Sequence, residues 1–316
     1  MRKKLIIILV VVIILFVGFT RFFRSNVKPT ELISRESQIP AGAVKLTPTM
    51  DDHPPILHTS EFQLPTPLDI ISSAGAEDSP FIPADRDELY FFFTPDVEVP
   101  AEGQLFDGVT GIYVSRRLAG VWQEPERVRL QKPGKLALDG CEFIQGDMML
   151  FCSAREGYEG LQWFSAKYQN DSWTKWQPAN FDPAFDVGEL HIYNDELYYH
   201  SARPGGQGEY DIWLLSRIDG EWKNPVNVVV VNSETNDGWP YISPDGTELW
   251  FTRSYLGTPA VFRSKRVSDA WQPPELIVSQ FAGEPTLDRD GNLYFVHHYY
   301  RAGVMLEADI YVAYKK

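Results

Sequence analysis

The sequence is poor in the residues that build most metal and nucleotide sites. It has two cysteines and six histidines among 316 residues. It contains no two-His-plus-carboxylate spacing, paired-cysteine zinc motif, phosphate-binding loop or Ser-centred nucleophile elbow. We therefore expect neither a metal nor a cofactor. Basic residues are also few, because 29 Lys and Arg stand against 43 Asp and Glu. An acidic body repels phosphate backbones, so nucleic acid is not an expected partner.

Long apolar runs are absent except for one, residues 5–20 near the N-terminus. As a helix it would span roughly 24 Å, against a hydrocarbon core of about 30 Å. We expect residues 1–24 to be an uncleaved signal anchor that enters the cytoplasmic membrane through residues 5–20. A cleaved signal peptide is the alternative. Arg2, Lys3 and Lys4 precede the run, which predicts a cytoplasmic N-terminus and a periplasmic or extracellular remainder. Residues 25–44 lack periodicity and are predicted to be a linker.

The rest of the chain repeats with a period of about 50 residues. A Trp-x-x-Pro mark begins at Trp122, Trp222 and Trp271, and Trp173 holds the same place with its proline displaced. Five hairpin strands precede or follow these marks: Leu89-Tyr90-Phe91, Met149-Leu150-Phe151, Leu197-Tyr198-Tyr199, Leu249-Trp250-Phe251 and Leu293-Tyr294-Phe295. Four short strands in each repeat are typical of a propeller blade. We therefore predict an all-β fold with a five-bladed β-propeller over residues 45–316.

The five hairpins are accompanied by only four Trp marks, so one outer strand is missing from the C-terminal end. Residues Ser60 to Pro65 align without a gap to Gly220 to Pro225, and Phe62 takes the tryptophan position. We predict that this N-terminal strand pairs with the C-terminal strand around Ile310–Tyr314 and closes the ring, which removes a sheet edge. A chance match of Phe and Pro is the alternative.

Two stretches carry a family resemblance. Ser201 to Trp213, followed by Trp222 to Pro225, and the segment Pro240 to Gly246 resemble the TolB-type, WD40-like propeller repeats of bacterial envelope proteins. The resemblance implies a propeller fold and an envelope setting. It implies no catalytic residues, because the repeat is structural. TolB-type propellers are usually six-bladed, and the five marks of this chain depart from that number.

Acidic residues stand where the innermost strands of the predicted blades begin. They are Glu77, Asp78, Asp139, Glu142, Asp186, Glu189, Asp237 and Glu284. Innermost strands line the central channel, so these acids can form one ring. Five-bladed glycosidases of the arabinanase type place three carboxylates there, and glycoside cleavage needs one acid and one base or nucleophile. The catalytic candidates are Asp78, Glu142, Glu189, Asp237 and Glu284. The structural alternative is that such acids cap turns.

Three arginines end the second strands of the predicted blades, Arg155, Arg203 and Arg253. Arginine suits carboxylate recognition, so these residues and Glu142, Glu189 and Glu284 are candidate binding residues. Pairing of the arginines with the neighbouring acids is the alternative.

Cys141 and Cys152 flank one predicted hairpin. Pairing Gln145 with Met148 puts the two cysteines directly opposite each other, close to the range of a disulfide bond. Two reduced thiols are the alternative.

From these features we expect a membrane-anchored, non-catalytic propeller that binds an envelope protein or a glycan. The alternative function is a glycoside hydrolase of the arabinanase-like type that uses the central carboxylates.

Overall fold

The computed structural model describes residues 33–316 except 133, 180 and 182–186, and this part of the chain is almost entirely β-structure. Helix is confined there to the short α1 (Ala101–Gln104) and to two 3-10 turns at Arg35–Gln38 and Pro48–Met50. The predicted all-β class is confirmed.

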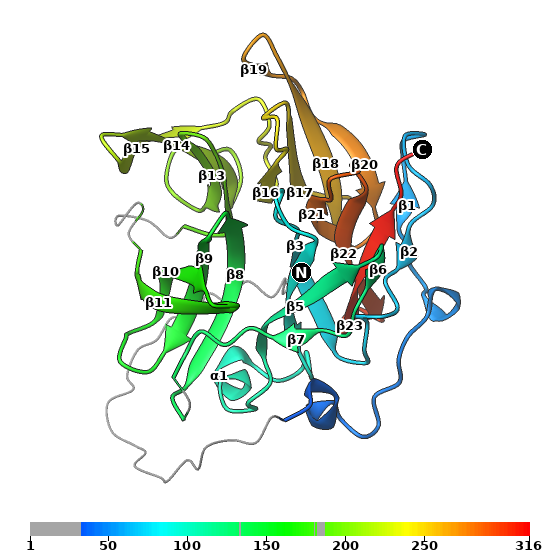
Figure 1. The fold of residues 1–316 in the computed structure, drawn as a ribbon. Helices are drawn as coiled ribbons and strands as arrows, with labels where there is room; N and C mark the ends of the chain where they lie inside the picture. The colour runs from blue at the N-terminus through cyan, green and yellow to red at the C-terminus, as the bar shows by residue number, and fades with distance from the viewer. Residues whose placement is uncertain (1–32, 133, 180, 182–186) are drawn as a thin grey trace, which may run out of the picture.

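The described strands form four sheets, of six, four, four and nine strands. The nine-stranded sheet holds two antiparallel ladders linked by the single parallel pair Ala308–Ala76, so we describe the strands as five antiparallel units (Figure 1). Unit 1 comprises β3 (Ala76–Phe81), β4 (Glu88–Thr94), β5 (Gly111–Leu118), β6 (Val121–Trp122) and β7 (Glu126–Arg127). Unit 2 comprises β8 (Ala137–Gln145), β9 (Met148–Arg155), β10 (Leu161–Gln169) and β11 (Ser172–Pro178). Unit 3 comprises β12 (Leu190–Tyr193), β13 (Glu196–Ser201), β14 (Asp211–Ile218) and β15 (Glu221–Asn227). Unit 4 comprises β16 (Asp237–Ile242), β17 (Glu248–Tyr255), β18 (Thr258–Val267), β19 (Ala270–Trp271) and β20 (Glu275–Ser279), with β1 (Ile56–Leu57) at its edge. Unit 5 comprises β21 (Ala282–Leu287), β22 (Leu293–Arg301), β23 (Val304–Ala313) and β2 (Thr66–Pro67).

The first strand of each unit lies toward the middle of the molecule, where β3, β8, β16 and β21 are seen in Figure 1. The second strands carry the Leu-aromatic-aromatic marks, and these side chains are almost fully buried, as for Leu89, Tyr90 and Phe91. Strands covered on both faces by neighbouring layers read as nearly continuous apolar runs. The apolar core therefore lies between the units.

Aromatic contacts join outer strands of units 2 and 4 to the unit before each of them. Trp173 of unit 2 meets Tyr90 of unit 1 edge to face, with ring centroids 6.5 Å apart. Trp271 of unit 4 meets Tyr198 of unit 3 at 6.0 Å. Edge-to-face pairs at such distances are favourable beyond the area they bury. The repeated tryptophan is thus a contact between units.

The two ends of the described chain lie side by side. Thr66 and Pro67 pair antiparallel with Val312 and Tyr311, and Phe62 forms an isolated bridge with Lys315. Figure 1 shows the blue N-terminal segment beside the red C-terminal strand. The predicted pairing of the Phe62 segment with the C-terminal strand is present.

Part of the expected linker packs against unit 1, and Lys45, the residue that follows the linker, packs against unit 5. Arg35 is buried and donates to Glu77 at 2.9 Å. Lys45 contacts the carboxylates of Glu307 and Asp309. Residues 33–58 therefore form a strap along the units, held by buried ion pairs.

The predicted localisation requires correction. Among the residues that the structure describes, no helix is long and apolar enough to cross a membrane, which contradicts the expected single-pass membrane protein with a periplasmic or extracellular propeller. The proposed anchor, residues 1–24, and its apolar run, residues 5–20, lie outside the described residues.

Candidate functional site

Four of the five innermost strands contain the same irregularity. Each gains one residue relative to its partner strand, a β-bulge that bends the strand and re-aims a side chain. The shifts occur between Asp78 and Phe81, Gly140 and Phe143, Gly238 and Tyr241, and Gly283 and Thr286. The bulged residues have left-handed backbones: Ser79 (φ 49°), Cys141 (φ 56°), Trp239 (φ 50°) and Glu284 (φ 54°). We call these the bulge residues.

Unit 3 supplies Glu189 at the corresponding place. Gly188 donates from its backbone N–H to the carbonyl of His200 at 2.8 Å, and β12 begins at Leu190. Glycine precedes this position in four units, as at Gly188 and Gly238. A Cβ atom on Gly188 would lie 2.1 Å from Nε2 of His200, so close approach of a neighbouring side chain requires glycine there.

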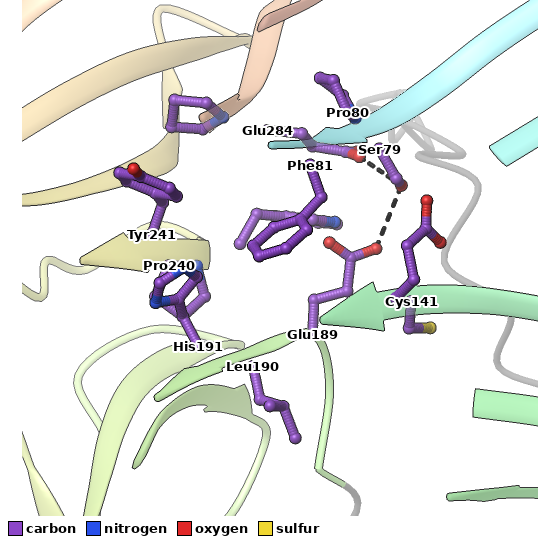
Figure 2. Close-up of a pocket in the computed structure, with 13 residues that line it drawn as sticks. Ser79, Pro80, Phe81, Cys141, Glu189, Leu190, His191, Pro240, Tyr241 and Glu284 are labelled. Carbon is purple, nitrogen blue, oxygen red and sulfur yellow. Dashed lines mark hydrogen bonds between the residues drawn. The ribbon is translucent and has the colours of Figure 1, made fainter. Parts of the chain in front are cut away.

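The bulges surround a cavity of about 40 Å³ to which all five innermost strands contribute. Its carboxyl groups are those of Glu142, Glu189 and Glu284, and Ser79 also lines it. Figure 2 labels Ser79, Glu189 and Glu284. Roughly 10–15 Å³ of such space holds one water molecule, so the cavity can take water or a small group. None of the described residues that line it is Lys or Arg. We call this the acidic cavity.

Ser79 links two of the carboxyl groups. Its Oγ lies 2.6 Å from Oε2 of Glu284 and 3.2 Å from Oε1 of Glu189, as the dashed lines in Figure 2 show. A hydroxyl has a single proton to donate. When Ser79 bonds both groups at once, one carboxyl must therefore be protonated and donate to Ser79. Consistently, burial and then the charge of Asp78 raise the pKa of Glu189 to about 8.

Glu142 lies in the wall of the acidic cavity. Both carboxylate oxygens are buried and have no hydrogen-bond partner among the described residues. Burial, followed by the charges of Glu189 and Asp78, raises the pKa of Glu142 well above its usual value. Burying a carboxylate without a partner costs free energy. We therefore expect Glu142 to be protonated or to bind a group that enters the cavity.

Asp78 and His298 lie beside Glu284, although only Glu284 of the three lines the acidic cavity. Oδ1 of Asp78 lies 3.8 Å from Nε2 of His298. Burial alone would raise the pKa of Asp78, but hydrogen bonding and charge from His298 hold it below its usual value. One ligand atom each of Asp78, Glu284 and His298 lies within 4.8 Å of the others. These three residues are the set that could hold a metal ion.

Three other acids of the predicted ring pair with arginines. Asp237 pairs with Arg253 at 2.6 Å, and Asp139 pairs with Arg155 at 2.7 Å. Glu77 pairs with Arg35 from the strap. Asp186 lies outside the described residues. The structure therefore divides the ring into acids with arginine partners and acids that converge on the cavity.

The candidate binding arginines are placed accordingly. The guanidinium of Arg155 lies over the ring of Trp176 at 4.3 Å as well as against Asp139. Arg203 donates to the Tyr199 hydroxyl at 2.7 Å and lies over Trp213 at 4.9 Å. None of the three lines the acidic cavity.

A disulfide joins Cys141 to Cys152, with Cα atoms 5.4 Å apart. Gln145 does pair with Met148, but the bulge places Gly140, not Cys141, opposite Cys152. The disulfide therefore ties a bulge residue, next to Glu142, to the second strand of its own unit.

Aromatic and imidazole rings form part of the wall of the acidic cavity. His191 packs against Phe143 at 4.8 Å and Tyr241 at 4.7 Å, and burial lowers the pKa of His191 to about 3, so it is neutral. Phe81, His191 and Tyr241 line both this cavity and a second, mostly apolar one of about 230 Å³.

Sequence reasoning missed Ser79 and His298 as site residues. No spacing in the sequence marks His298, because Asp78, its partner in the structure, comes from a strand far away in the sequence. A signal for the bulges exists in the aligned segments Asp78-Ser79-Pro80, Gly140-Cys141-Glu142, Gly188-Glu189-Leu190, Gly238-Trp239-Pro240 and Gly283-Glu284-Pro285.

No protein-family model matches the chain, and no curated protein matches it in sequence. Solved structures that are similar include TolB from Acinetobacter baumannii (14% identity, TM-score 0.45, 78% of this chain). They also include Bacteroides ovatus Xyloglucan PUL GH43B (15%, 0.45, 77%) and the catalytic domain of Coprinopsis cinerea GH62 alpha-L-arabinofuranosidase (10%, 0.48, 79%). The chain spans 56% of the TolB chain, 52% of the Bacteroides chain and 95% of the Coprinopsis domain. Likenesses at this level carry no conclusion about activity.

Proposed function

We propose that the chain is a closed, five-bladed β-propeller whose central carboxyl groups hydrolyse a glycosidic bond. Each of the five units is then one blade. The nine-stranded sheet contains two of them, units 5 and 1, joined only by the single parallel pair Ala308–Ala76.

Ring closure is supported by the contacts between units. Trp122 of unit 1 meets Tyr294 of unit 5 with centroids 6.1 Å apart, and Phe62, on the edge of unit 5, meets Trp250 of unit 4 at 6.1 Å. The outer strand of unit 1 thus contacts unit 5 through a tryptophan, as the outer strand of unit 2 contacts unit 1. A cyclic order of five units satisfies all of these contacts.

One observation supports this reaction. Glu142 and Glu189 line the same cavity, and none of the described residues that line it is Lys or Arg. Two nearby carboxyl groups of like charge lose their protons in separate steps. Between those steps the pair holds one acid and one base, which are the two groups that glycoside hydrolysis requires. Glu189, bonded to Ser79, is the proton donor. Glu142, whose oxygens have no described partner, either takes a proton from the water that attacks the anomeric carbon or attacks that carbon itself. In both cases Glu189 gives its proton to the glycosidic oxygen as the bond from that oxygen to the anomeric carbon breaks, and in the second case water then hydrolyses the glycosyl-enzyme.

The surroundings favour an uncharged substrate. The acidic cavity and a net charge of −14 repel anionic sugars. Trp239 and Pro240 stand on the cavity wall, and such apolar surfaces suit the faces of sugar rings. The cavity itself is too small for a whole sugar, so the reacting bond would enter it from the mouth, where Ser79 and Glu189 are only partly buried.

A screen with aryl glycosides, of both anomers and both ring sizes, and with neutral polysaccharides tests the proposal. We expect Glu142→Gln and Glu189→Gln to lower kcat by about 10²–10⁴-fold while circular dichroism stays unchanged. Glu234→Gln is the matched control, because Glu234 is an exposed acid away from the cavity.

Hydrolysis that persists in both cavity variants would contradict the proposal. Glycan binding by calorimetry without turnover of any substrate would instead support the non-catalytic binding role that the sequence suggested. The product anomer, followed by NMR, would assign Glu142 as base or nucleophile.

A further inference from the structure

We infer that Asp78, Glu284 and His298 bind one divalent metal ion at the edge of the acidic cavity. The inference deepens the proposed function by adding an ion beside the Glu142–Glu189 pair. It uses other side chains, and its test requires no turnover, so the two proposals can fail separately.

The geometry fits one shared ion. Asp78 comes from β3, Glu284 from β21 and His298 from β22, and their ligand atoms lie within 4.8 Å of one another. Bonds of about 2.0–2.4 Å from one ion place its ligands no more than about 4–5 Å apart. Asp78 Oδ1 and His298 Nε2, 3.8 Å apart, satisfy this limit without movement of the strands.

The histidine is oriented as a ligand. Nδ1 of His298 lies 3.4 Å from the carbonyl oxygen of Phe281. A carbonyl can only accept, so Nδ1 carries the proton when this contact is a hydrogen bond. The lone pair of the neutral ring is then on Nε2, which faces Asp78. Ligating histidines usually donate their other N–H to a carbonyl or carboxylate in this way.

Glu142 supplies an independent reason for a cation. It is 6% exposed, it lines the same cavity, and neither carboxylate oxygen has a described protein partner. By contrast, the acids Glu77, Asp139 and Asp237 each pair with an arginine. No described basic side chain that lines the cavity neutralises its carboxyl groups. A bound ion would neutralise them.

The donor set indicates the kind of ion. Imidazole nitrogen suits Zn²⁺ and other transition ions, whereas carboxylate oxygen suits Mg²⁺, Ca²⁺ and Mn²⁺. Two carboxylates with one imidazole favour an ion that accepts both donors, so we expect Mn²⁺ or Zn²⁺ to bind more tightly than Ca²⁺. Because the ligands lie on units 1 and 5, the ion would also join the two units at the centre.

Calorimetric titration of the chelator-treated full chain with Mn²⁺, Zn²⁺ and Ca²⁺ is the test. We expect one ion per chain, a higher Tm with the ion bound, and at least tenfold weaker binding in Glu284→Gln and in His298→Gln. The control Glu234→Gln should bind as the wild type does. Circular dichroism shows whether each variant is folded, and Co²⁺ absorption reports an imidazole ligand in the wild type that His298→Gln lacks.

Two results would overturn the inference. One is the absence of binding in the wild type, which would mean that a shared proton holds Asp78 and Glu284 together. The other is stoichiometric binding that Glu284→Gln and His298→Gln leave unchanged, which would place the ion elsewhere. An ion bound as expected in a chain that hydrolyses nothing would support the metal site and contradict the proposed reaction.

Discussion

Phe62 lies edge to face with Trp250, and their ring centroids are 6.1 Å apart. Phe62 is 2% exposed although it belongs to no regular strand, and its backbone bridges Lys315 near the other end of the chain. One aromatic side chain therefore holds the N-terminal segment against both unit 4 and the C-terminal strand.

Phe62→Ala should destabilise the protein by about 3–4 kcal/mol, since it removes a buried ring and leaves a cavity. Urea unfolding followed by tryptophan fluorescence measures the loss. Leu64→Ala, at a side chain that is 79% exposed, should change stability by less than about 0.5 kcal/mol. Equal effects of the two substitutions would show that the Phe62 contact does not hold the ends together.

Glu307→Gln should change how stability depends on pH. Burial raises the pKa of Glu307 from 4.5 to about 7, although the hydrogen bond from Lys45 acts to lower it. A carboxyl with a raised folded-state pKa adds stability that is complete below pH 4.5 and is lost as the pH rises through 7. Between pH 4.5 and 8 the free energy of unfolding of the wild type should therefore fall by on the order of 3 kcal/mol. The variant should not show this fall. Parallel pH profiles of the unfolding free energy would refute this.

Removal of the disulfide should destabilise the chain by about 2–3 kcal/mol, because Cys141 and Cys152 are only 11 residues apart and close a short loop. Urea midpoints with and without reductant measure this loss. The double variant Cys141→Ser/Cys152→Ser should be insensitive to reductant. A wild type that is equally insensitive would mean that the bond does not contribute.

Gly188→Ala should be strongly destabilising, because its Cβ would lie 2.1 Å from Nε2 of His200. His200 cannot retreat easily, since its ring lies tilted against Trp239, with centroids 4.7 Å apart. The backbone of Gly238 is also close, because a Cβ there would be only 3.1 Å from Cγ of His200. Thermal unfolding should show a lower Tm, and His200→Ala in the same chain should restore part of it. Gly42→Ala, which would have no atom within 4 Å, is the neutral control. A normal Tm for Gly188→Ala would show that the strand adapts.

Local patterns were sufficient to predict the five hairpins and the pairing of the ends, because strand alternation, turn residues and the Trp-x-x-Pro mark are visible within short windows. The site was predictable only as a set of acids. Which of them keep a free carboxyl depends on partners from other strands, such as Arg253 for Asp237. The strap was missed because its side chains Arg35 and Lys45 are polar and look exposed in sequence, although they bury ion pairs.

The bulges also explain why the register around Cys141 could not be read from the turn. Counting back from Gln145 and Met148 assumes one residue for one residue, and the extra residue after Gly140 breaks that count. Three of the four bulges follow a glycine, Gly140, Gly238 or Gly283, and this glycine before a variable residue is the trace that they leave in the sequence.

Because the side chain of each bulge residue stands outside the regular pairing of its ladder, exchanging it need not disturb a neighbour's register. Serine, cysteine, glutamate and tryptophan already occupy equivalent places in this one chain. A centre assembled in this way can acquire a new chemistry by single substitutions at the bulge residues. The aromatic contacts between the units stay unchanged.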